Sequence, residues 1–318
     1  MSAAFHIQPL CEFFGVSRSG FYSWRKVQDT PSPRDLANRK LIQRIRQIHE
    51  DHRGLYGSPK VTRALRQEGL KCGHNRVARL MRREGLRGVP SKGFVPRTTD
   101  SKHSNPVAPN RLAQLPSPPV ELNEVWVSDI TYLPSNDGWL YLAAVMDLAS
   151  RKIIGWHLED HLQTSLPLRA LHRAVSARKP VSPVIHHSDR GCQYTSREYN
   201  QALQHARLLP SMSATGSCYD NAAMESFWSI LKREIGVTRF PSQPEARRQI
   251  FDYIEVFYNR QRLHSSLGYQ SPETFEKEKL KTNFERKERP NLARPLPSFC
   301  RQSQPKPAAP ILPPVATV

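Results

Sequence analysis

The strongest hydrophobic pattern lies in the middle of the chain. Residues 125–133, VWVSDITYL, alternate in polarity and are rich in β-branched and aromatic side chains, which predicts a strand with Asp129 at its centre. The sequence SNDG at 135–138 is a turn signal, and residues 140–148 and 152–158 predict two further strands. Three antiparallel strands are therefore expected in succession.

Helices and short strands alternate after these three strands. We expect a helix at about 165–178, a short strand at 184–189 that ends at Asp189, a helix at about 196–206 and a last short strand at 208–213. This order of elements is that of a ribonuclease-H-like fold. The predicted fold class is therefore α/β, with a mixed five-stranded sheet and flanking helices.

A further helix is predicted from about 221 to 235, with Asp220 as its N-cap. Its buried stripe is expected to consist of Met224, Phe227, Trp228 and Leu231. Glu225, Ser229 and Lys232 fall at i, i+4 and i+7 on a different face. The glutamate and the lysine should therefore point the same way, two turns apart, off the packed side.

Helical periodicity dominates the amino-terminal third. In residues 10–24, a short apolar helix is followed by Gly15 and by a second helix with Ser17 as its N-cap. This is the pattern of a helix-turn-helix, although an ordinary helical hairpin fits it equally well.

Residues 34–87 predict a unit of three more helices. The first runs from about 34 to 51, the second follows the cap Ser58-Pro59 and stops at Gly69, and the third opens at His74-Asn75. The side chains expected to face inward are Leu36, Leu41, Ile45, Ile48, Val61, Leu65, Val77, Leu80 and Met81.

The third helix of this unit carries arginines on its outer side, and such a helix can lie in the DNA major groove. Its arginines could contact bases or phosphates, and phosphate contacts are commoner. The candidate DNA-binding residues are Arg76, Arg79 and Arg83, next to Arg82. The pair His49 and His52 would need a downstream CxxC to hold zinc; the chain has only Cys72 there, so no zinc site is expected.

Charge supports a nucleic-acid partner. The chain has 318 residues with 47 Lys+Arg and 28 Asp+Glu, a formal net charge of +19. Residues 34–90 alone carry 15 basic and 5 acidic side chains, whereas residues 120–225 carry 9 basic and 11 acidic ones. One part of the chain is therefore suited to gripping phosphates, and the other is rich in carboxylates.

Several protein classes are excluded by composition. No apolar run approaches the roughly 18 residues of a membrane span, and the N-terminus lacks the layout of a secretory signal. The five cysteines are odd in number and widely spread, which fits a reduced, cytoplasmic protein. We expect no membrane partner.

Two proline-rich stretches suggest how the chain is divided. Seven prolines lie in 90–119 and eight in 290–318, so neither stretch can form a continuous helix or a central strand. The expected organisation is a short helix-turn-helix-like segment at 1–33, a basic three-helix DNA-binding domain at 34–90, a linker at 91–119, a catalytic domain with a C-terminal helical extension at 120–280, and a disordered basic tail at 281–318.

Asp129, Asp189 and Glu225 are the candidate catalytic and metal-binding residues. Mg²⁺ prefers oxygen ligands, and carboxylates held on two strands and one helix can bracket two ions about 3.5–4 Å apart. Such a site supports in-line displacement at a phosphodiester; Mn²⁺ could substitute. The chain has no GxxxxGK[ST] loop, so ATP is not the expected phosphate source.

Three nearby polar residues are expected to be structural. Asp147 precedes Ala149-Ser150-Arg151 and should close that turn; direct metal ligation is the alternative. Of His186 and His187, one is expected in the core and one at the rim, because Mg²⁺ avoids imidazole.

The motifs WVSDITY, HSDRGCQYTS and DNAAMESFW resemble the DDE signatures of bacterial insertion-sequence transposases. Between Asp189 and Glu225 lie 35 residues, the spacing shared with retroviral integrases. YNRQRLHSSLGYQSPETF at 258–275 resembles the tail motif of the second-reading-frame transposases of the insertion-sequence-three family, and GVSRSGFYSW, LYGSPKVTRAL and HNRVARLMRREGL resemble their amino-terminal segments. The resemblance covers about residues 10–280.

This resemblance implies an integrase catalytic core that cuts one strand at an element end and joins that 3′-OH to the other end. The resulting DNA circle is then integrated into a target. Asp129, Asp189 and Glu225 match the metal-binding triad, and Lys232 matches a basic residue that contacts terminal DNA. It also implies element-end and target DNA as partners, a homo-oligomer on DNA and a nucleoid-associated bacterial location. The family's active product is usually a frameshift fusion with a leucine zipper, and no sustained heptad occurs here. A first-reading-frame partner protein is therefore expected.

Two other functions remain open at this stage. A nuclease of the same ribonuclease-H-like fold would use the same carboxylates to hydrolyse nucleic acid without joining it. A non-catalytic DNA-binding regulator of transposition would keep the helix-turn-helix units, but the intact triad argues against it.

Overall fold

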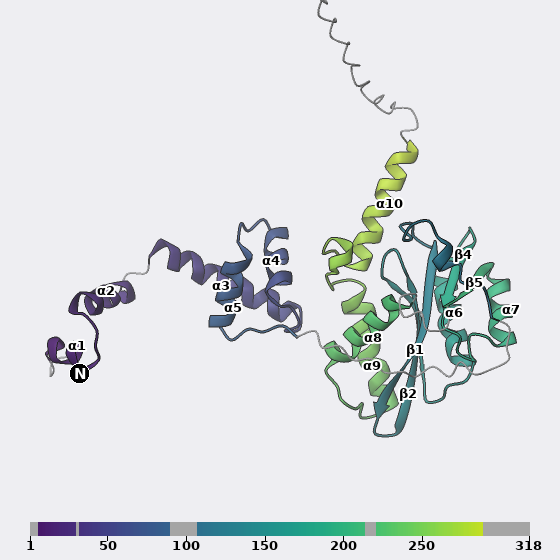
Figure 1. Cartoon of the computed structure of the whole chain (residues 1–318), viewed down its shortest axis with the longest axis horizontal. Helices are drawn as coiled ribbons and strands as arrows, with labels where there is room; N and C mark the ends of the chain where they lie inside the picture. Colours follow the sequence, from purple (N-terminus) through teal and green to yellow (C-terminus); the bar gives the residue numbers. More distant parts are fainter. Residues whose placement is uncertain (1–5, 30–31, 90–106, 214–220, 289–318) are drawn as a thin grey trace, which may run out of the picture. The chain divides into compact units, whose positions relative to one another are not determined.

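The computed structural model describes residues 6–29, 32–89, 107–213 and 221–288 (Figure 1). Residues 91–106 of the predicted linker lie outside these ranges. The rest of the linker, residues 107–119, contains one short 3₁₀ helix, η1 (Leu112–Gln114). The prediction that the disordered tail begins at residue 281 was wrong, because residues 281–288 continue the helix α10 (Pro272–Glu288). From residue 289 onward the predicted tail lies outside the described residues.

The middle of the chain forms a mixed five-stranded sheet, which confirms the predicted α/β class. Its strands are β1 (Val125–Ser135), β2 (Gly138–Asp147), β3 (Ile153–Glu159), β4 (Val184–Ser188) and β5 (Leu208–Met212). The spatial order is β3-β2-β1-β4-β5; β1, β2 and β3 are antiparallel, and β4 and β5 run parallel to β1. The long hairpin β1–β2 therefore crosses the middle of the sheet.

Helices cover both faces of this sheet, as Figure 1 shows. One face packs on α6 (Ser165–Arg178) and α7 (Arg197–His205). The other packs on α8 (Ala222–Ile235), α9 (Gln243–Phe251) and a π-helix, η2 (Asp252–Tyr258). At Gly155 a Cβ would lie 2.3 Å from the Ala170 carbonyl oxygen, so only glycine lets α6 approach the sheet this closely.

The predicted tail motif wraps onto the free edge of β3. Asn259 is buried, and its side-chain amide accepts from Ile153 N–H at 3.0 Å and donates to the Ile153 carbonyl at 2.9 Å. The amide thus satisfies backbone groups that an edge strand leaves open. A 3₁₀ turn, η3 (Ser265–Leu267), and the helix α10 (Pro272–Glu288) follow.

The amino-terminal unit has the three predicted helices: α3 (Pro33–Asp51), α4 (Ser58–Gln67) and α5 (His74–Arg83). Two details of the prediction were wrong. Leu36 is 49% exposed, and Ile42 takes the inward position instead. Gly57, not Ser58, is the N-cap of α4, and the Ser58 hydroxyl instead bonds His74 Nε2 at 3.0 Å.

A helical hairpin precedes this unit, formed by α1 (Ile7–Phe13) and α2 (Arg18–Asp29). Gly15 supplies the left-handed turn with φ +64°, and the Ser17 hydroxyl accepts a hydrogen bond from Gly20 N–H at 3.0 Å. The predicted turn and cap residues therefore act as expected.

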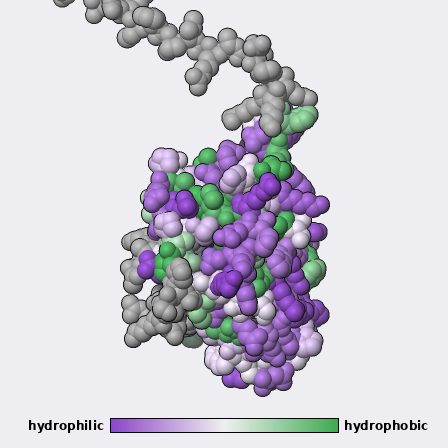
Figure 2. Space-filling view, turned by 90° about the vertical axis from the view of Figure 1, so that its right-hand side faces the viewer, coloured by the Kyte–Doolittle hydropathy of each residue, from purple (hydrophilic) through white to green (hydrophobic). Residues whose placement is uncertain are grey.

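The molecular surface carries no continuous apolar band on the face shown in Figure 2, which is mainly hydrophilic with scattered hydrophobic areas. Within the described ranges, no helix is long and apolar enough to cross a membrane.

Candidate active site

Asp129 lies in the middle of β1, on the sheet face that α8 covers. It pairs with Ala144 of β2, and its side chain shares a face with Val127, which belongs to the core under α8. Trp228 of α8 donates its indole Nε1–H to Asp129 Oδ2 over 2.9 Å. The helix therefore holds one oxygen of this carboxylate in a fixed position.

Asp189 directly follows β4, the neighbour of β1. In the parallel register His187 lies opposite Val127, and continuing it by two residues brings Asp189 opposite Asp129. The Asp189 carboxylate accepts a hydrogen bond from Gly191 N–H at 2.9 Å, which turns the chain after the strand. The sheet thus brings the two aspartates side by side.

Glu225 lies in the first turn of α8 and is exposed. The predicted N-cap, Asp220, lies outside the described residues; Asn221 holds the N-cap position, without a side-chain capping bond. The predicted apolar stripe of this helix is confirmed, since all four of its residues are buried: Met224, Phe227, Trp228 and Leu231. Packing of this stripe turns Glu225 away from the core.

Asp189 and Glu225 lie close enough to Asp129 to affect its protonation. Burial raises the pKa of Asp129, and the negative charges of Asp189 and Glu225 raise it further. The hydrogen bond from Trp228 lowers it in part. Like charges gathered in this way are stabilised by a cation, and a donor set made only of carboxylate oxygens suits a hard divalent ion.

Lys232 lies two turns along α8 from Glu225 and is half-buried. Burial lowers the pKa of Lys232, and the nearby charge of Asp129 opposes that shift. The lysine therefore lies within electrostatic reach of Asp129.

The predicted DNA-binding arginines are on α5, in the amino-terminal unit. Arg79 and Arg83 are exposed, whereas Arg76 is half-buried and donates through Nε to Asn38 Oδ1 at 2.9 Å. Arg76 thus joins α5 to α3, and Arg79 and Arg83 are the more accessible of the three.

Asp147 closes the turn after β2, as predicted. It is fully buried and accepts hydrogen bonds from Asn123 N–H at 2.8 Å and from Ser150 N–H at 3.0 Å. Both carboxylate oxygens of Asp147 therefore accept hydrogen bonds from backbone N–H groups.

The prediction that one of two adjacent histidines lies at the rim was wrong, because both are buried. His186 Nε2 bonds the Ser128 hydroxyl at 2.8 Å, and His187 bonds two serine hydroxyls of the β5 region, Ser211 and Ser213. Burial lowers the pKa of His186 to about 3, so it stays neutral and structural.

His49 and His52 each bond a backbone carbonyl. His49 Nε2 contacts the Arg87 oxygen at 3.2 Å, and His52 Nδ1 contacts the Ile48 oxygen at 2.8 Å.

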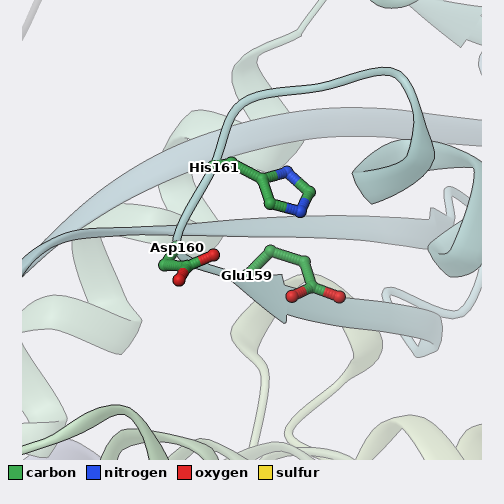
Figure 3. Close-up of side chains that lie close together, drawn as sticks. All are labelled: Glu159, Asp160 and His161. Atoms are coloured by element: carbon green, nitrogen blue, oxygen red, sulfur yellow. The ribbon is translucent and has the colours of Figure 1, made fainter.

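A second group of possible metal ligands lies at the end of β3, where Figure 3 shows Glu159, Asp160 and His161 together. Glu159 is already paired, with His157 Nε2 at 2.6 Å and Arg169 Nη1 at 3.3 Å. Its charge is therefore offset by protein groups, and this cluster carries no metal assignment.

Two residues at functional positions were not predicted as such. Trp228 was assigned to the core, although its position three residues after Glu225 was a signal that it lies near the site. Buried Glu276 accepts from the Ser150 hydroxyl at 2.7 Å and pairs with Lys152 and Arg178, which joins α10 to the turn that Asp147 closes. No sequence signal indicated this long-range contact.

Comparison with known proteins places this chain among described families. Models described as "Integrase core domain" match residues 119–218 and 206–272, and one described as "HTH-like domain" matches residues 36–94. The chain is 42% identical to the "Insertion element IS600 uncharacterized 31 kDa protein" of Shigella sonnei, over 84% of this chain and 97% of that protein. It is 40% identical to the "Transposase InsF for insertion sequence IS3A" of Escherichia coli (strain K12), over 87% of this chain and 96% of that protein.

Solved structures resemble the chain more distantly. The HTLV-2 integrase catalytic core domain in complex with magnesium is 13% identical with a TM-score of 0.38, covering 48% of this chain and 95% of that one. The catalytic domain of Mos1 mariner transposase is 15% identical with a TM-score of 0.36, covering 42% and 71%. The family assignment rests on the sequence relatives: this chain belongs to the IS3 family of insertion-sequence transposases, as a protein of the second-reading-frame InsF type.

Proposed function

We propose that this chain cleaves one strand at each end of an insertion sequence and transfers the resulting 3′-OH to another DNA site. The observation that supports this proposal is that Asp189, which follows β4, and Glu225 of α8 both lie within electrostatic reach of Asp129 in β1. In cleavage, water adds to the phosphorus and the bond to the 3′ oxygen breaks. In transfer, the 3′-OH freed by cleavage attacks the phosphorus of a second phosphodiester. The bond from that phosphorus to the 3′ oxygen of the second strand breaks.

The donor set fits Mg²⁺, and we propose that two ions bind, with Mn²⁺ able to substitute. Asp129, Asp189 and Glu225 would hold these ions, because both other carboxylates lie within electrostatic reach of Asp129. When bound, such ions lower the pKa of the attacking hydroxyl or water and stabilise the leaving oxygen. Trp228 keeps the second oxygen of Asp129 oriented.

Basic residues serve the phosphates of the DNA. Lys232 would hold a phosphate beside the scissile bond, and Arg79 and Arg83 would contact the duplex from α5, with Arg76 supporting that helix. We further propose element-end and target duplexes as substrates, more than one copy on the DNA, a first-reading-frame partner protein and a cytoplasmic, nucleoid-associated location.

The test is incubation of the chain with two element-end duplexes and Mg²⁺, alone and with the first-reading-frame protein. We expect cleaved and joined strands. Cleavage without any joining would identify a nuclease, and DNA binding without either reaction would identify a regulator; both results would contradict the proposal.

Removing any one of the three carboxylates should abolish strand cleavage and leave DNA affinity nearly unchanged. Asp129→Asn, Asp189→Asn and Glu225→Gln each delete one metal-binding charge with little change of shape. Cleavage and duplex affinity are measured side by side for each variant. Asp160→Asn is the matched control, because exposed Asp160 lies in the other carboxylate cluster and should cleave normally. Wild-type joining by any triad variant would reject this site.

A further inference from the structure

A groove of about 670 Å³ lies along the C-terminal half of β1, beyond the residues that pair with β4. β4 pairs with β1 at Val125–Val127, and β1 continues to Ser135, where it bridges to Phe240. Between these points the described residues place no strand against this edge of β1. The groove fills that space, with the C-terminal half of α8 and the segment after it as its other wall.

Aromatic side chains from the β1–β2 hairpin line one side of this groove. Tyr132 and Tyr141 are direct cross-strand partners with ring centroids 5.1 Å apart, and Trp139 lies edge-on to Tyr132 at 6.4 Å. Trp139 is 58% exposed, which is unusual for so large an apolar side chain. Leu231 and Ile235 of α8 form apolar lining opposite.

The groove shares Lys232 with the candidate active site. Lys232 and Thr131 line it, and Thr131 lies two residues from Asp129 in β1. Tyr132 lies within electrostatic reach of both Asp189 and Asp129, whose charges help to raise its pKa beyond the effect of burial. A DNA strand held at the carboxylates would therefore pass the mouth of this groove.

We infer that this groove binds one unstacked nucleotide of the element end, with its base against Trp139 and the tyrosines and its phosphate towards Lys232. This inference rests on the proposed function, because it places the terminal DNA at the carboxylates. The volume lies in the range of roughly 300–1,000 Å³ typical of sites for small ligands. Aromatic faces bind any base by stacking, which replaces the stacking energy lost when a base leaves the duplex.

Charge favours a nucleotide over a protein segment as the occupant. A peptide strand added to the edge of β1 would bind through hydrogen bonds to the β1 backbone. Such binding would not require the cation Lys232 or the exposed Trp139 in the lining. A ligand with an anionic group and a flat ring, such as a nucleotide, can contact both the lysine and the tryptophan.

The test is a cycle of four affinities between the full chain and an element-end duplex without divalent metal, so that no strand is cut. Wild type and Trp139→Ala are each measured on the normal duplex and on duplexes lacking one base, taken in turn from the last three nucleotides of each strand. At one of these positions, loss of the base should weaken wild-type binding on the order of tenfold and leave Trp139→Ala binding unchanged. Trp139→Phe should behave as wild type, because it keeps a stacking face.

Phe251→Ala is the matched control, since Phe251 is an exposed aromatic residue outside this groove. This variant should keep the full effect of base removal, and thermal melting confirms that each variant is folded. Equal sensitivity of wild type and Trp139→Ala to base removal at all positions would overturn the inference. Absence of joining in Mg²⁺ would instead overturn the proposed function, because the cycle is measured without catalysis.

Discussion

At the scale of single residues, the three carboxylates are placed by different means. Asp129 and Asp189 are fixed by strand register, whereas Glu225 depends on how α8 rotates on the sheet. Trp228 determines that rotation, because one side chain both packs in the core and bonds Asp129. The position of Glu225 is therefore coupled to Asp129 through Trp228.

We predict that Trp228→Phe slows strand cleavage about tenfold and raises the Mg²⁺ concentration needed for half-maximal rate. The variant keeps most of the ring packing and loses the hydrogen bond to Asp129, and a bond to a charged group contributes about 1.5–3 kcal/mol. The measurement is the cleavage rate over a Mg²⁺ series, with thermal melts. An unchanged Mg²⁺ midpoint would mean that the indole only packs.

Lys232→Ala should weaken end joining far more than it weakens folding, and Lys232→Arg should restore part of the activity by keeping the charge. The half-buried lysine lies within electrostatic reach of Asp129, where we propose that it holds a phosphate. Joining of pre-nicked ends is measured at two salt concentrations. If the alanine variant joins as fast as wild type at both, the lysine is a solvated surface residue.

At the scale of elements, the spacing of hydrophobic residues predicted the bounds of the strands and helices of the catalytic fold closely. The predicted helix at 165–178 is α6, and the predicted stripe of α8 is the buried one. Local sequence could not show contacts between distant segments. Glu276 reaches Arg178, and Asn259 pairs with Ile153, because the chain folds back across the sheet. The same limit explains the wrong rim position for a histidine, since the β5 serines that cover His187 lie far along the chain.

The helix α8 is held at its C-terminal end by a buried ion pair. Arg262 donates through Nε and Nη2 to the two oxygens of Glu234, both at 2.8 Å, and Tyr253 donates its hydroxyl to the same carboxylate. Burial would raise the pKa of Glu234, but Arg262 lowers it below its ordinary value. The stability from this pair is therefore present above the ordinary glutamate pKa and is lost as the pH falls through the lowered one.

Arg262→Ala should accordingly lower the free energy of unfolding by about 3–5 kcal/mol, because it leaves a buried carboxylate without a partner. The loss should be largest near neutral pH and shrink in acid, where Glu234 is protonated in both proteins. Denaturant unfolding at several pH values measures this. Arg248→Ala removes an exposed ion pair with Glu245 and should cost little at any pH. A pH-independent loss in Arg262→Ala would contradict the assignment.

At the scale of the whole molecule, basic and acidic residues are divided between two functions. The three-helix unit carries the positive surplus, and the sheet carries the carboxylates, a division that composition alone indicates. Composition could not show that the unit also contacts the catalytic part. Tyr56, between α3 and α4, is buried, accepts from Leu263 N–H at 2.8 Å and donates to the Gln261 carbonyl. The tail motif at 258–275 therefore contacts the three-helix unit as well as the sheet.

The salt dependence of DNA binding should report the accessible arginines of α5. Each phosphate that a side chain neutralises releases counterions, so removing one contact should reduce the slope of log affinity against log salt by about 0.9. We expect Arg79→Ala and Arg83→Ala each to show this reduction on any duplex sequence, because phosphates carry no sequence information. Arg76→Ala should lower the stability of the unit as well, since Arg76 bonds Asn38. A loss confined to the element-end sequence would instead show that these arginines read bases.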